Sequence, residues 1–110
     1  MNDFAINETT IKEINKEITG EGVVIKDSIS SCFSSWDYYE DIESKISSVV
    51  RSIIKNHYFK DGNKRTAFAV FHLLSHYNGK VMPNKKWERI FMDIASNNYS
   101  VDKIKKLLFS

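Results

Sequence analysis

The sequence is poor in cysteine, in long apolar runs and in net charge. Its one cysteine, Cys32, excludes an internal disulfide and is typical of a reducing compartment. No run approaches the about 18 apolar residues of a membrane-spanning helix. The first residues of the chain carry acids and asparagines where a secretory leader has basic and then apolar residues. We therefore expect a cytoplasmic protein without membrane contact.

The small net charge limits the binding partners. Lys and Arg number 16 against 14 Asp and Glu, which gives a formal net charge of +2. A domain that binds nucleic acid through a general electrostatic footprint is usually more basic, with a pI above about 9. We expect no direct contact with nucleic acid, and any anion site has to be local.

Length and composition indicate one globular domain. The 110 residues fit a common domain size of about 100 to 150 residues. Hydrophobic residues make up 42% and charged residues 27%, which excludes a disordered chain. Repeats and low-complexity stretches are absent from the sequence. We expect a single domain over residues 1–110.

The apolar periodicity predicts a mainly α fold. Apolar residues recur every three or four positions along most of the chain, as on the buried face of a helix. The stretch that stops at Asn78 and Gly79 is apolar on more than one face, which predicts the central and most buried helix. Thr10, Asp41 and Ser100 are the expected N-caps. The expected helices cover roughly residues 10–19, 42–56, 64–77, 87–95 and 101–109, with a partly helical, aromatic-rich connector at 28–40.

The short apolar stretch Val23, Val24 and Ile25 lies between turn-forming residues and cannot form a stable helix alone. It predicts a small strand or β-hairpin, and we call these three residues the flap segment. The chain as a whole is thus expected to form a compact bundle of five to six helices with this hairpin as its β-structure.

The stretch HYFKDGNKR breaks the helical pattern with polar and charged residues. Asp61, Gly62 and Asn63 precede a helix, whose N-terminus offers unpaired N–H groups and about half a positive charge. Gly62 allows a positive φ or a close approach, as a phosphate-cradling turn requires. Lys64 and Arg65 add two cations, although cations oppose the dipole of a first helical turn. This mismatch favours a phosphate site over a plain connection.

Two further side chains of this loop suggest catalysis. A lone carboxylate beside bound phosphates is the usual protein share of a Mg²⁺ site, so Asp61 is the expected metal ligand. A histidine side chain can accept the proton of an attacking hydroxyl, so His57 is the candidate general base. A base, a metal ligand and an anion cradle then occupy one loop.

The loop resembles the signature of the Fic/Doc family, HxFx(D/E)(G/A)N(G/K)R. Every fixed position matches, and the amphipathic helix before it and the apolar helix after it extend the resemblance over about residues 42–79. The matching positions are His57, Phe59, Asp61, Gly62, Asn63, Lys64 and Arg65.

The resemblance implies a Fic-type helical bundle and a transferase that uses ATP, or another nucleotide, together with Mg²⁺. It implies that His57 is the general base on a protein hydroxyl, that Phe59 anchors the loop in the core and that Asp61 binds the metal. The implied nucleotide-binding residues are Gly62, Asn63, Lys64 and Arg65.

Lys64 indicates the subtype. AMP-transferring members usually carry Gly at this position and an Arg three residues after the motif arginine, where this chain has Phe68. A Lys resembles the Doc (death on curing) toxins, which hold the nucleotide in the reverse sense and transfer its γ-phosphate to a threonine of translation elongation factor Tu. Ala69 departs from Doc, which has a polar residue there.

Other interpretations stay open beside the toxin kinase. One is Fic-type AMP or other nucleotidyl transfer, and another is a noncatalytic module that keeps the Fic fold, against which the intact His57 and Asp61 speak. A DNA-binding helix-turn-helix is disfavoured by the modest charge. The family's inhibitory string (S/T)xxxE(G/N) is not evident, so the resemblance implies an antitoxin in trans, and it implies that the flap segment docks the target protein.

Overall fold

The described part of the chain, residues 6–26 and 29–110 of the computed structural model, folds mainly into helices. Five α-helices and two short 3-10 helices form, which confirms the predicted mainly α bundle. No helix among these residues is long and apolar enough to cross a membrane. In chain order the elements are α1 (Glu8–Thr19), η1 (Ile29–Phe33), η2 (Trp36–Tyr38), α2 (Ile42–Asn56), α3 (Asn63–Tyr77), α4 (Trp87–Ser96) and α5 (Val101–Phe109).

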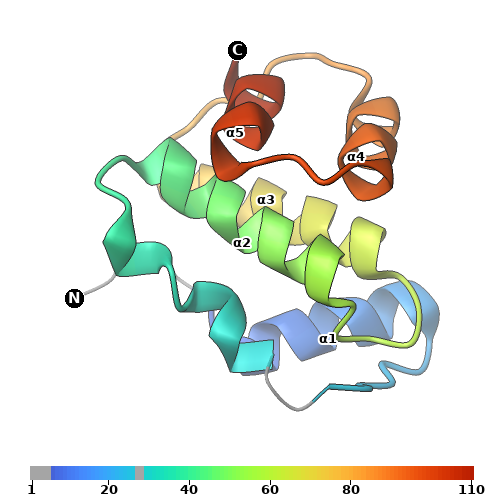
Figure 1. Cartoon of the computed structure of the whole chain (residues 1–110). Helices are drawn as coiled ribbons and strands as arrows, with labels where there is room; N and C mark the ends of the chain where they lie inside the picture. Colours follow the sequence, from blue (N-terminus) through green and yellow to red (C-terminus); the bar gives the residue numbers. More distant parts are fainter. Residues whose placement is uncertain (1–5, 27–28) are drawn as a thin grey trace.

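The helices α2 and α3 lie side by side in the middle of the bundle (Figure 1). α1 packs against α3 on one side, while α4 and α5 lie on the opposite side of the central pair. The two 3-10 helices pack along α2. The loop between α2 and α3 therefore emerges at one end of the bundle, next to the C-terminal end of α1.

The most buried helix is α2, not α3 as we predicted. α2 buries eight of its 15 residues and α3 buries six of 15. The wide apolar surface of α3 suggested the opposite, but some of it, such as Phe68 and Leu73, stays partly exposed. α2 is packed by η1, η2, α3, α4 and α5, whereas α3 is packed mainly by α1, α2 and α4, with one ring contact to α5 between Phe71 and Phe109. Position in the bundle, which periodicity does not report, decides the burial.

Three helices begin directly after residues whose side chains cap them. α1 begins at Glu8, two residues before the predicted start, because the side chain of Asn7 accepts a hydrogen bond from the Thr10 N–H at 3.0 Å. Asn ranks among the best N-cap residues, and it outcompetes the predicted cap Thr10. Asp41 and Ser100 cap α2 and α5 as predicted.

The connector between the flap segment and α2 is partly helical, as predicted. Trp36 and Cys32 are each only 2% exposed and belong to the core. Burial raises the pKa of the Cys32 thiol to about 12, so the reactive thiolate is scarce at neutral pH. Tyr38 is 81% exposed, so this aromatic residue of the connector does not anchor it in the core.

The predicted β-hairpin of the flap segment does not form among the described residues. Val24 instead makes an isolated antiparallel bridge with Phe59, and the Ile25 N–H donates to the Tyr58 carbonyl at 2.8 Å. The loop after α2 thus supplies the backbone partners that a second hairpin strand would have supplied. The prediction was wrong because this pairing spans more than thirty positions of sequence, which local turn signals cannot reveal.

Candidate active site

The loop between α2 and α3 begins and ends in the left-handed backbone region. His57 is the C-cap of α2 with φ 49° and ψ 56°, and Gly62 is the N-cap of α3 with φ 75°. Among the described residues, His57 is the one non-glycine residue with positive φ. Such a conformation costs of order 1–3 kcal/mol and is typical of functional sites. α2 ends at Asn56 as predicted, and α3 begins at Asn63, one residue before the predicted start.

Two buried aromatic side chains fix the loop to the core. Tyr58 and Phe59 are each 1% exposed. The Tyr58 hydroxyl lies 2.9 Å from the hydroxyls of Ser31 and Ser52, which belong to η1 and α2. Since Tyr58 and Phe59 directly follow His57, the exposed His57 side chain is carried by an anchored backbone.

The Asn63 side chain holds the loop in shape. Its Oδ1 accepts from the Phe59 N–H at 3.0 Å, and its Nδ2 donates to the Phe59 carbonyl at 2.8 Å. Both polar atoms of the side-chain amide are therefore occupied by hydrogen bonds within the loop. The nucleotide-binding role predicted for Asn63 thus depends on its backbone N–H. The first bond of α3 runs from the Thr66 N–H to the Gly62 carbonyl at 2.8 Å. The N–H groups before Thr66 have no acceptor within the helix, as an anion site requires.

Asp61 and Arg65 form an open ion pair at the mouth of this site. Their closest charged atoms, Arg65 Nη2 and Asp61 Oδ2, are 3.9 Å apart, and the side chains are 58% and 77% exposed. An exposed pair of this kind contributes about 0–1 kcal/mol. Asp61 Oδ1 also accepts the Gly62 N–H at 2.8 Å, so the groups that can turn toward a ligand at little cost are Asp61 Oδ2 and the Arg65 guanidinium.

The donor set fits Mg²⁺ better than a metal held by protein ligands alone. Within the described residues no group of three or more His, Cys, Asp or Glu side chains could hold a metal ion. Asp61 is a lone, exposed carboxylate beside a helix N-terminus. Mg²⁺ keeps several waters and takes further oxygens from phosphates, so one carboxylate at such a position suffices.

The predicted catalytic, metal and nucleotide residues surround one open pocket of about 370 Å³. The flap segment is not part of its lining, but the Val23 carbonyl accepts the Lys60 N–H at 2.9 Å, so the segment lies alongside the pocket. The residues that line the pocket are His57, Lys60, Asp61, Gly62, Asn63, Lys64 and Arg65.

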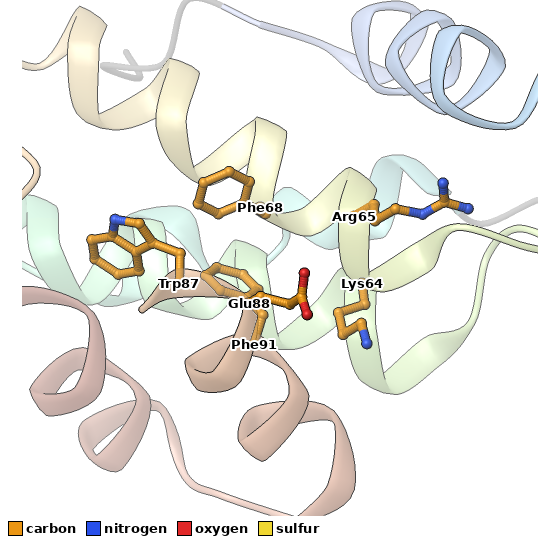
Figure 2. A pocket seen from close by; sticks show the side chains of 6 residues that line it. All are labelled: Lys64, Arg65, Phe68, Trp87, Glu88 and Phe91. Carbon is orange, nitrogen blue, oxygen red and sulfur yellow. The ribbon is translucent and has the colours of Figure 1, made fainter. Parts of the chain in front are cut away.

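A second pocket adjoins the first and shares Lys64 and Arg65 with it. It measures about 210 Å³, and three of its six lining residues are aromatic (Figure 2). With the first pocket it reaches the about 300–1000 Å³ typical of small-molecule sites. Sequence analysis missed it because α3 and α4 each supply part of the wall. Its other lining residues are Phe68, Trp87, Glu88 and Phe91.

Sequence analysis also missed Asn15, a fully buried side chain of α1. Its Nδ2 donates to the Asp61 carbonyl at 2.8 Å and to the Thr66 hydroxyl at 3.0 Å. It thus joins α1 to the loop and to the first turn of α3. One signal was present in the sequence: Asn15 stands four residues after the buried Ile11, at a position that helical periodicity assigns to the core.

We expect Asn15→Leu to lower the free energy of unfolding by about 1 to 3 kcal/mol, because the Asp61 carbonyl and the Thr66 hydroxyl lose their donor. Urea denaturation of wild type and variant measures the change. The substitution also removes Asn15 Oδ1, which is buried without a hydrogen-bond partner. Its removal is favourable, so we expect a loss near the lower end of this range. An unchanged unfolding midpoint would show that the two hydrogen bonds carry no net stability.

Comparison with known proteins places this arrangement in a family. A model of the Fic/DOC family matches residues 5–75, more than half of the chain, including the whole loop. A search of curated proteins and a search of solved structures found no match. The chain belongs to the Fic/DOC family.

Proposed function

We propose that this protein is a Doc-like toxin that transfers the γ-phosphate of ATP to a protein hydroxyl. Membership in the Fic/DOC family indicates a Fic-type transferase that acts on proteins and uses a nucleotide. The observation that carries the proposal is the shared pocket: His57, Asp61 and Lys64 surround it, and the N-terminus of α3 opens into it. A base, a metal ligand and an anion site are thus within reach of one ligand.

The phosphates of ATP fit the N-terminal end of α3. The N–H groups of its first turn, the helix dipole and the charges of Lys64 and Arg65 all favour an anion there. Mg²⁺ on Asp61 would supply positive charge to the phosphates, as in other phosphoryl transfers. The positions of these groups, rather than covalent chemistry by the protein, account for the catalysis.

His57 completes the reaction as general base. In the proposed step, the acceptor hydroxyl gives its proton to His57, its oxygen forms a bond to the γ-phosphorus, and the bond from that phosphorus to the β–γ bridging oxygen breaks. ADP leaves with that oxygen. The exposed His57 side chain at the pocket edge is accessible to a residue of another protein.

The aromatic pocket is suited to the nucleobase. Phe68 and Phe91 meet edge to face with their ring centroids 5.4 Å apart, and Trp87 packs 6.3 Å from Phe68. Rings of this kind stabilise a stacked base by about 1–3 kcal/mol. Lys64 lines this pocket and the phosphate pocket, so the residue that distinguishes Doc-like members lies where it can influence the direction of the bound nucleotide.

The partners follow from the same proposal. The acceptor is a threonine of translation elongation factor Tu, and an antitoxin in trans restrains the enzyme. Val23 and Ile25 of the flap segment are 40% and 57% exposed. The backbone groups of Val24 point away from the loop, because successive residues of a strand alternate in the edge to which they bond. That edge is available to a strand of the target protein.

The test uses ATP labelled separately on the α- and γ-phosphate, with Mg²⁺ and a bacterial extract. We expect label on protein from γ-labelled ATP only. Label from the α position would instead establish AMP transfer. No label from either position, with a protein that is folded by circular dichroism, would contradict the proposed chemistry.

A further inference from the structure

Glu88 is a carboxylate at the junction of the two pockets. It lies in the first turn of α4 and lines the aromatic pocket beside Lys64 and Arg65. Figure 2 shows its carboxylate between the aromatic rings and the Lys64 side chain. Its carboxylate makes no hydrogen bond or ion pair with the described residues. Its oxygens are therefore free to accept hydrogen bonds from a ligand.

The ligand groups that can meet Glu88 are limited by charge. A carboxylate only accepts hydrogen bonds, so it repels phosphate oxygens and needs a donor. A cationic ligand in the aromatic pocket would meet the positive charges of Lys64 and Arg65 at its rim and the Lys85 ammonium, 5.7 Å from the Trp87 ring centroid. A neutral donor is the better partner.

The nucleotide supplies such a donor at this place. The proposed function puts the base among the rings and the phosphates at the N-terminus of α3, with the ribose between them. Glu88 occupies the same intermediate position. The groups of a ribose that donate hydrogen bonds are its 2′- and 3′-hydroxyls. An acidic side chain on a ribose hydroxyl is a recognition mode that dinucleotide-binding folds also use.

We propose that Glu88 selects ribonucleotides over deoxyribonucleotides by accepting a hydrogen bond from a ribose hydroxyl. This inference rests on the proposed function, because it needs a nucleotide in the two pockets. It concerns this chain in particular, since Glu88 lies outside residues 5–75, which match the family. A site built to bond a hydroxyl discriminates against the analogue that lacks it. We expect about a tenfold preference, because Glu88 is exposed and water competes with it.

Nucleotide binding to the full chain tests the inference without any transfer reaction. Titration calorimetry with Mg²⁺ measures the Kd of ATP, 2′-deoxy-ATP and 3′-deoxy-ATP, and Trp87 in the pocket provides a fluorescence signal as a second readout. We expect at least one deoxy analogue to bind wild type about tenfold more weakly than ATP. Glu88→Ala should raise the Kd of ATP to that of the analogue and leave the analogue's own Kd unchanged.

Glu17→Ala is the matched control, because Glu17 is an exposed acid of α1 outside both pockets. It should keep the wild-type preference. Equal Kd values for ATP and both deoxy analogues in wild type would overturn the role of Glu88. A preference for ATP that persists in Glu88→Ala would overturn it too. Either result would leave the proposed function standing. A folded wild-type protein that binds none of the three nucleotides would overturn the proposed function as well.

Discussion

Replacing His57 by asparagine is expected to slow the proposed phosphoryl transfer by about 100- to 10,000-fold, the usual contribution of a general base. Asparagine cannot accept the hydroxyl proton at neutral pH. It does tolerate the left-handed backbone, which His57 adopts with φ 49°, better than alanine does. The variant therefore removes the base without distorting the loop. His57→Ala would remove the base and could distort the loop as well.

The rate of γ-label transfer to protein measures this effect, and calorimetry of ATP binding accompanies it. We expect an unchanged Kd, because the proposed anion site consists of the N–H groups at the start of α3 and does not include His57. His72→Asn is the control, because His72 is an exposed histidine of α3 that does not line the pocket around His57 and Asp61. Transfer by His57→Asn at the wild-type rate would exclude His57 as the base.

The strongest local signals in the sequence predicted the framework of this site. The periodicity of α2 and α3 and the cap at Asp41 predicted where these two helices lie, and the structure agrees to within one residue. Both signals act within a few residues. Capping and helical spacing are physical effects of neighbours in sequence, and for that reason they can be recognised in one sequence.

The parts that could not be predicted depend on contacts between distant segments. Asn15 reaches the Asp61 carbonyl across 46 residues, and Trp87 approaches Phe68 only because α4 folds back over α3. The flap segment pairs with the loop instead of with itself. Helical spacing marked Asn15 as a buried position, but its partners follow from the packing of α1 on α3.

This packing also explains why position 62 is glycine. A Cβ added to Gly62 would lie 2.7 Å from Thr19 Cγ2 and 3.3 Å from Asn15 Nδ2. We predicted that glycine would permit a positive φ or a close approach at a phosphate-cradling turn. The positive φ is confirmed, and the close approach is to α1. The shape of the anion site is therefore set by a helix that contributes no residue to the pocket lining.

Gly62→Ala is accordingly expected to lower the free energy of unfolding by about 2 to 5 kcal/mol, combining the strain of a left-handed alanine with overpacking against α1. Gly79→Ala is the matched control. Gly79 has nearly the same φ, 71°, but a Cβ there meets nothing within 4 Å. It should lose only about 1–2 kcal/mol from strain. Equal losses in urea denaturation of the two variants would contradict overpacking of the new Cβ against α1.

A second substitution isolates the contact itself. Thr19→Ser removes the Cγ2 methyl that the new Cβ would meet and keeps the hydroxyl, which donates to the Asn15 carbonyl at 2.9 Å and accepts the Gly22 N–H at 3.0 Å. The double variant should recover about 1 kcal/mol or more relative to the sum of the single changes, as neighbouring sites do in a double-mutant cycle. ATP binding, which the proposed function assigns to the N-terminus of α3, should be stronger in the double variant than in Gly62→Ala, because relief of the clash lets that N-terminus return to its position. Additive losses would mean that Gly62 is required only for its positive φ and that α1 does not shape the site.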